Sequence, residues 1–291
     1  SLQPTYGGGG QDGIVFRLSP DMSSLDWATY LGGTDYDAAF GIKRATTGDL
    51  YVCGGTASGT FPTTAGAYQS SYQGGLADGF LAQLDSTGSS LLAATLTGTT
   101  TYDNAIFVDL DRQDNPYILG NADAAMPVVN ANWSTTAGGQ FIQRFQPGLT
   151  GLDFATQFGT NDREPGFPST DMSDLALTAF QVDICGNIYL SGWGGVTSEL
   201  GTQTRNLPVT NEPEPQFRSS PDGNFSDFYL LVLYPDADSL YFASYYGEQH
   251  ATNDFVGEHV DGGTSRFDPS GGIYQSVCAS CNASNGFPTT P

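Results

Sequence analysis

Short runs in which apolar and polar residues alternate recur along the chain, and four such runs form a unit that occurs four times. The first run opens on Asp or Gln and covers residues 12–18, 78–84, 140–145 and 227–233. The second run carries Ala followed by Thr or Ser and covers residues 25–32, 91–98, 152–159 and 240–247. Alternation over such short lengths predicts β-strands whose two faces differ.

The third and fourth runs complete each unit. The third is less regular and covers residues 39–43, 105–110, 177–182 and 260–267. The fourth follows a polar turn and has Tyr at one fixed position, namely Tyr51, Tyr117, Tyr189 and Tyr274. A linker containing Pro comes next, at residues 61–64, 126–128, 207–209 and 287–290. Because Pro has no N–H to donate to a ladder, we expect each linker to lie outside the sheet.

Four strands per unit predict an all-β fold, a β-propeller built from four-stranded antiparallel blades. The predicted blades cover residues 12–77, 78–138, 139–226 and 227–291 within a single repeat domain. A lone sheet would leave both faces wet, whereas stacked units bury their apolar side chains between them. A β-solenoid and tandem sandwiches are the alternatives. We expect the chain to be a piece of a longer array, although a ring of four could also close.

The charge of the chain narrows the range of partners. Only 9 Lys and Arg stand against 31 Asp and Glu, which gives a net charge of -22. Such a surface repels phosphate backbones and anionic lipids, so we expect no nucleic-acid partner. No apolar run reaches 18 residues, so we expect no membrane insertion. Four cysteines in an acidic chain poor in Lys favour an oxidising, extracellular setting.

Three of the cysteines are candidates for disulfides. Cys278 and Cys281 form a single CxxC pair, and a zinc site would need two further ligands, for which His250 and His259 are the candidates. We expect a structural disulfide instead, with Cys185 of the neighbouring unit bridged to Cys278 or Cys281. The sequence does not choose among the pairings.

Cys53 takes the place of Ser191 and Ser276 in the repeat, which predicts a small buried residue.

Asp109, Asp111 and Asp114 are a candidate calcium site, since closely spaced carboxylates supply the hard oxygen ligands that Ca²⁺ prefers. The same segment precedes a fourth run, where Asp and Asn also form turns. Apart from Ca²⁺, we expect no cofactor.

Catalytic motifs are missing from the sequence, which has no Ser-His-Asp order, no HExxH and no phosphate-binding loop. We therefore expect that the chain is not an enzyme. The alternative is a propeller that binds or cleaves carbohydrate, which would use exposed Trp side chains and a carboxylate pair. Trp193, flanked by Gly residues, is the candidate ring for contact with a glycan, whereas Trp27 lies in a strand and is expected in the core.

Residues 12–33 and 48–64 resemble the bacterial SBBP family, the seven-bladed β-propeller repeat. The resemblance rests on the Asp-Gly strand, the Ala-Thr-Tyr-Leu-Gly-Gly strand and the Phe-Pro-Thr-Thr linker. Residues 261–268 and 274–281 look like segments of large Bacteroidota proteins that carry gliding-motility-associated sorting domains and use type IX secretion. This resemblance implies a non-catalytic structural or interaction module at the cell surface, which serves adhesion, gliding or filament assembly. Its implied partners are proteins, further copies of itself or glycans.

Overall fold

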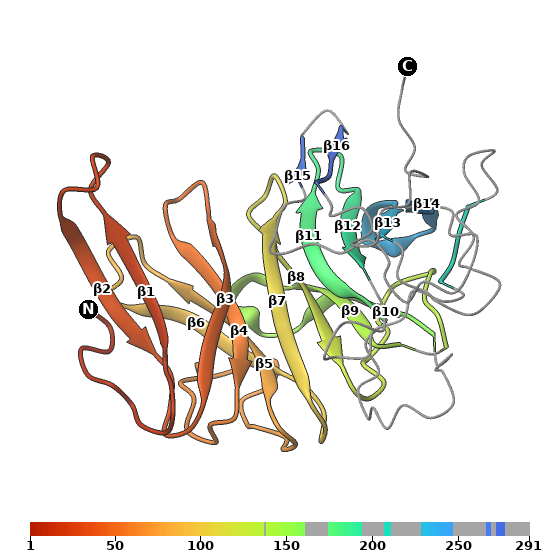
Figure 1. Ribbon diagram of the computed structural model, residues 1–291. Helices are drawn as coiled ribbons and strands as arrows, with labels where there is room; N and C mark the ends of the chain where they lie inside the picture. The colour runs from red at the N-terminus through yellow and green to blue at the C-terminus, as the bar shows by residue number, and fades with distance from the viewer. Residues whose placement is uncertain are drawn as a thin grey trace, which may run out of the picture. The chain divides into compact units, whose positions relative to one another are not determined.

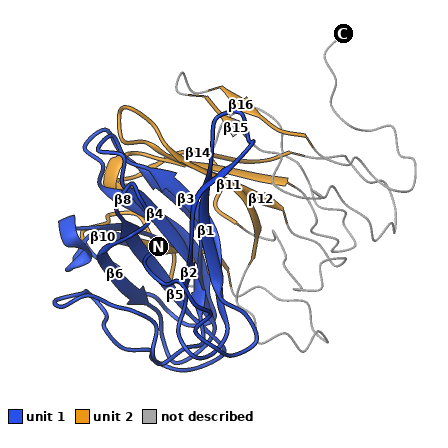
Figure 2. Cartoon of the chain, turned by 90° about the vertical axis from the view of Figure 1, so that its left-hand side faces the viewer, with its two compact units in different colours: residues 1–129, 141–155 blue, residues 130–140, 156–291 orange. Residues whose placement is uncertain are grey.

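The computed structural model describes residues 1–136, 138–160, 174–193, 207–210, 228–246, 266–268 and 272–276. In this part the chain consists of β-strands and two short 3-10 turns, which confirms the all-β prediction. The chain divides into two compact units, of residues 1–129 with 141–155 and of residues 130–140 with 156–291 (Figure 2). No helix among the described residues is both long and apolar enough to cross a bilayer.

The strands form antiparallel sheets of four or of two (Figure 1). The two-stranded sheets are β1 (Gly13–Leu18) with β2 (Leu25–Leu31), and β15 (Arg266–Phe267) with β16 (Ile273–Tyr274). The four-stranded sheets are β3 (Asp37–Arg44), β4 (Leu50–Thr56), β5 (Asp78–Leu84) and β6 (Leu91–Thr97); β7 (Asp103–Leu110), β8 (Pro116–Ala122), β9 (Gln140–Phe145) and β10 (Leu152–Phe158); and β11 (Ala176–Val182), β12 (Ile188–Trp193), β13 (Phe228–Leu233) and β14 (Leu240–Tyr246).

The four-stranded sheets start half a repeat later than the predicted blades. Strands β3 and β4 come from one predicted blade and β5 and β6 from the next, so the predicted boundary at residues 77 and 78 falls inside a sheet. The Pro linker at 61–64 is irregular, as expected, yet β4 and β5 pair on either side of it. A repeat has the same period in every phase, so the pattern alone could not place the breaks between sheets.

A β-bulge explains why the third run is the least regular. The register shifts between Ala39 and Gly41 in β3, and the same shift occurs in β7 and β11. An extra residue at a bulge reverses the order of inward and outward side chains. The alternation therefore breaks at the same place in each copy.

The sheets of the first unit stack face to face, and successive residues point into opposite layers of core. Val52 and Phe80 pack with Val15 of β1 in one layer. Tyr51 and Leu81, which neighbour them in sequence, pack with residues of β7–β9 in the other layer. Burying a large apolar side chain contributes about 1.5–3 kcal/mol, so both layers stabilise the stack.

The second unit contains the sheet β11–β14 and the hairpin β15–β16. The ring of Tyr189 on β12 lies 5.7 Å from that of Phe267 on β15. Tyr229 on β13 is fully buried, and its hydroxyl donates to the backbone carbonyl of Pro208 at 2.5 Å. The linker that carries Pro208 thus packs beside the sheet without joining its ladder.

Candidate functional site

The three aspartates proposed for calcium have separate partners. Oδ1 of Asp109, which is buried, lies 2.5 Å from Nζ of Lys43 on β3. Asp114 has a positive φ and accepts a hydrogen bond from the backbone N–H of Thr46 at 3.0 Å. Both contacts tie β7 and its turn to the neighbouring sheet, so the two carboxyl groups hold sheets together.

Asp111 closes its own turn. It accepts from the backbone N–H of Asn115 at 3.0 Å and from the side-chain amide at 2.8 Å. Asp183 and Asn187 repeat this arrangement before β12, at 2.9 and 2.8 Å. Within the described ranges no three Asp, Glu, His or Cys side chains gather as a metal site. The Asp residues of these hairpins therefore shape turns.

The structure describes two of the four cysteines. Cys53 is fully buried as predicted, and burial raises the pKa of its thiol well above the usual range, which makes the thiol unreactive. Cys185 is exposed and is not in a disulfide with any described residue. Cys278 and Cys281 lie outside the described residues, so the bridge to Cys185 stays a prediction.

The tryptophans also differ in position. Trp27 on β2 packs at the border of the core and its ring covers Gly88, as the prediction of a core residue requires. Trp193 is the last residue of β12 and is half-buried, paired in register with Ala176 and Phe228. Its role as a glycan contact stays a prediction.

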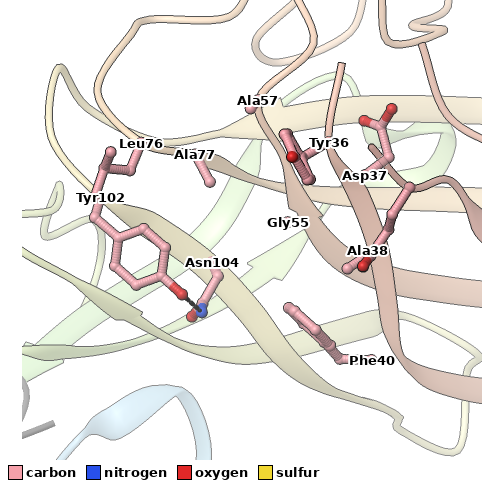
Figure 3. Close-up of a pocket in the computed structure, with 11 residues that line it drawn as sticks. Tyr36, Asp37, Ala38, Phe40, Gly55, Ala57, Leu76, Ala77, Tyr102 and Asn104 are labelled. Carbon is pink, nitrogen blue, oxygen red and sulfur yellow. Dashed lines mark hydrogen bonds between the residues drawn. The ribbon is translucent and has the colours of Figure 1, made fainter. Parts of the chain in front are cut away.

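A pocket that the sequence analysis missed opens between β3, β4 and β7 (Figure 3). It encloses about 120 Å³. Tyr36 and Phe40 are more than half exposed beside it, and Nδ2 of Asn104 donates to the hydroxyl of Tyr102 at 2.7 Å. Gly55 lines it, and a Cβ there would meet nothing closer than 3.5 Å. Cavities of this size hold about one ring, so the pocket suits a single sugar or side-chain ring.

A repeat signal could have revealed this pocket. Tyr36 and Tyr102 stand at the same place in the first two copies of the repeat, each directly before the Asp that opens a third-run strand. Their side chains lie in connections between sheets, where strand periodicity gives no information. Comparing the connections of the two units would have found the pair.

A second surface is the outer face of β1 and β2, where Ile14, Phe16, Leu18 and Leu25 are 42–58% exposed. We call these four residues the end face. A hollow of about 220 Å³ adjoins it, bordered by Pro4 and Tyr30. The edge of β1 that faces away from β2 also has no paired strand among the described residues, whereas the equivalent strand β5 pairs with both β4 and β6. An apolar face beside an open strand edge is typical of a protein contact.

Comparison with known proteins adds no relative to this picture. No known protein family matches the chain, and no curated protein matches it either. The resemblance to SBBP repeats and the Bacteroidota origin therefore stay predictions. So does the absence of enzyme activity, because both histidines lie outside the described residues.

Proposed function

We propose that the chain is a non-catalytic β-propeller module of a secreted bacterial surface protein, which serves adhesion, gliding or filament assembly. The end face carries this proposal. Its residues Ile14, Phe16 and Leu18 stand where β5 has Phe80, Ala82 and Leu84, and those three side chains are fully buried. On β5 these three side chains are covered by the sheet β1–β2. A further sheet of this kind therefore fits the end face, and we propose that a second copy of the chain supplies it.

The open edge of β1 supports the same partner. The sheet β1–β2 has two strands where its neighbour has four. Two strands added along β1 would complete a four-stranded blade and satisfy the free backbone groups of that edge. Completion of this blade would give the sheet β1–β2 the four strands of a propeller blade. Secretion and the cell surface follow from the resemblance and from the acidic, Lys-poor composition.

Negative-stain electron microscopy of the full chain tests this function. We expect ring-shaped heads joined to one another in closed multimers or along a fibre. A field of separate, monodisperse monomers would contradict assembly, and elongated stacks without a central ring would contradict the propeller.

The pocket favours a second candidate, carbohydrate binding. Exposed aromatic rings stack on the apolar faces of sugars, and an amide such as that of Asn104 offers polar contacts. We expect Tyr36→Ala to abolish any glycan signal of the chain on a glycan array. Trp193→Ala is the matched comparison, since it tests the ring that the sequence favoured. Equal signals in wild type and Tyr36→Ala would exclude the pocket.

A further inference from the structure

Two aspartates lie at each of the two junctions between sheets in the first unit. Asp12 and Asp78 stand at the same place in the repeat, at the start of the first run. Their counterparts, Asp37 and Asp103, open β3 and β7. Asp37, Asp78 and Asp103 are at most 1% exposed. At the second junction both carboxyl groups are therefore withdrawn from water, whereas Asp12 at the first junction is half-buried.

At the second junction each carboxyl group has one bonded and one unbonded oxygen. Oδ2 of Asp78 accepts from the backbone N–H of Gln73 at 2.8 Å and from Nε2 of Gln69 at 2.9 Å. Oδ2 of Asp103 accepts from the backbone N–H of Thr99 at 2.5 Å and from its hydroxyl at 2.8 Å. Oδ1 of both residues is buried and has no hydrogen-bond partner. Each of these two Oδ1 atoms thus lacks a hydrogen-bond donor, and an ionised Asp has no hydrogen of its own to donate.

Glycines let the carboxyl groups converge. At the first junction, a Cβ added to Gly32 would lie 2.8 Å from Oδ2 of Asp37 and 3.1 Å from Oδ1 of Asp12. At the second junction, a Cβ added to Gly98 would lie 2.8 Å from Oδ1 of Asp78. The next residue, Thr99, donates a hydrogen bond to Asp103. A side chain at either glycine would fill the space that the pair occupies.

Cations do not compensate these pairs. The ion pairs within the described ranges use Asp26, Asp109 and Asp153 instead. Burial, together with the charge of Asp103, raises the pKa of Asp78 to about 6. Burial likewise raises the pKa of Asp37 and Asp103. Two neighbouring buried carboxylates without a counter-ion are unfavourable, and one of them gives up its charge.

We propose that Asp78 and Asp103, the two carboxyl groups at the second junction, share one proton, which links neighbouring sheets and is lost as the pH rises. At the second junction Oδ1–H of one residue donates to Oδ1 of the other, so both unbonded oxygens are satisfied. One negative charge then remains on the pair, and it is stabilised by the four donors to the Oδ2 atoms.

The junction before the sheet β11–β14 offers a natural comparison. Gln140 replaces the first carboxyl, and Asp174 keeps the place of the second. The amide oxygen of Gln140 accepts from the backbone N–H groups of Asp174 at 2.9 Å and Leu175 at 3.1 Å. Asp174 accepts from the backbone N–H of Thr160 at 2.6 Å, just as Asp103 accepts from Thr99. A neutral amide, which brings its own N–H donors, therefore fits the position that a protonated Asp would occupy.

The remaining titratable neighbours do not change charge in the relevant pH range. Tyr72 faces Asp78, and Tyr6 faces Asp12 and Asp37. The pKa of each tyrosine is raised by burial and by these carboxylates. Both phenols therefore stay neutral in acid and do not contribute to the pH effect at the junctions.

The sign of the pH effect follows from the raised pKa. The folded chain holds the proton of Asp78 up to about pH 6, whereas an unfolded Asp releases it near 3.8. The stabilisation is therefore complete below pH 3.8 and is lost as the pH rises to about 6. One additional bound proton changes the folding constant by up to about tenfold per pH unit.

The test compares unfolding by urea in the presence of a chelator from pH 4 to pH 8, in wild type, Asp78→Asn and Asp35→Asn. Asp78→Asn should lessen the fall in stability with pH by up to about tenfold in the folding constant per pH unit. At pH 8 it should be at least as stable as wild type, since Asn supplies an amide as Gln140 does. Asp35→Asn, which removes an exposed charge, should keep the wild-type slope.

Two results would overturn the proposal. One is an equal pH slope in wild type and Asp78→Asn. The other is stabilisation by added Ca²⁺ that Asp78→Asn abolishes, which would replace the proton by a cation. If Asp78→Asn fails to fold, infrared spectra of wild type decide. Between pH 5 and pH 8 the C=O band of a buried protonated carboxyl group should disappear, and no change in that band would contradict proton sharing.

Discussion

Strands β1 and β5 have the same pattern and opposite surroundings. Ile14, Phe16 and Leu18 on β1 are exposed, whereas Phe80, Ala82 and Leu84 on β5 are fully buried. Figure 1 shows β1 and β2 beside the sheet β3–β6, which they cover on one face. The repeat therefore encodes two apolar faces for every sheet, and the presence of a neighbouring sheet decides whether a face is buried.

This contrast separates stability from interaction. On β5 the apolar face stabilises the fold, because it is removed from water. On β1 the same face contributes little to the fold of the isolated chain and is available for a partner. Changes on the two faces should therefore have different consequences, which a comparison of Phe80 with Phe16 tests. Two further comparisons test the contacts between neighbouring sheets.

The largest effect is expected at Phe80. Phe80→Ala leaves a cavity between two sheets and should lower the free energy of unfolding by about 3–5 kcal/mol. Phe16→Ala, a change of the same side chain on the end face, should alter it by no more than about 0.5 kcal/mol. Urea unfolding of dilute protein measures both values. A loss at Phe16 as large as that at Phe80 would show that the end face is already covered within one chain.

An intermediate effect is expected at the junction glycines. A Cβ on Gly98 would lie 2.7 Å from Cγ of Asp78, so Gly98→Ala must displace a buried, hydrogen-bonded side chain. We expect a loss of about 1–3 kcal/mol. Gly55→Ala is the matched control, because its Cβ would meet only ordinary contacts beyond 3.5 Å. Thermal unfolding of both variants should rank Gly98→Ala clearly below Gly55→Ala, and the reverse order would refute a tight junction.

The smallest effect is expected at a hydrogen bond between two neighbouring sheets. Asp114 joins the turn of one sheet to Thr46 of the next at an exposed site. Asp114→Gly keeps the positive φ but removes the acceptor, and should cost about 1 kcal/mol or less. High salt should leave most of this loss in place, because a hydrogen bond is screened less than a surface charge pair. An unchanged unfolding midpoint would mean that the hydrogen bond between Asp114 and Thr46 does not stabilise the contact between the sheets.

Sequence periodicity identified the strands but not how they are grouped. Tyr51, Tyr117 and Tyr189, which the fourth run marks, are all buried, whereas Tyr274 is 63% exposed. The repeat fixes which residues can face a core, but the third-run bulge and the phase of the sheets depend on pairing between strands. Those are contacts between distant parts of the chain, to which local alternation is blind.

The candidate sites were harder to predict than the fold. The spacing of Asp109 and Asp114 suggested a metal, and the structure shows each of them bonded to a neighbouring sheet, so the calcium site stays a prediction. Tyr36 recurs as Tyr102 in the next copy of the repeat, but the pocket beside them exists because two sheets meet there. Side-chain chemistry was visible in the sequence, but which groups meet was not.

The most direct test of the central claim is sedimentation of the full chain over a range of concentrations, in wild type, Phe16→Asp and Phe40→Asp. The two phenylalanines are 56% and 53% exposed, so both changes place one charge on an exposed ring position. We predict that wild type and Phe40→Asp self-associate and that Phe16→Asp stays monomeric. A monomeric wild type at every concentration, or equal association of the two variants, would contradict the end face as the contact between copies.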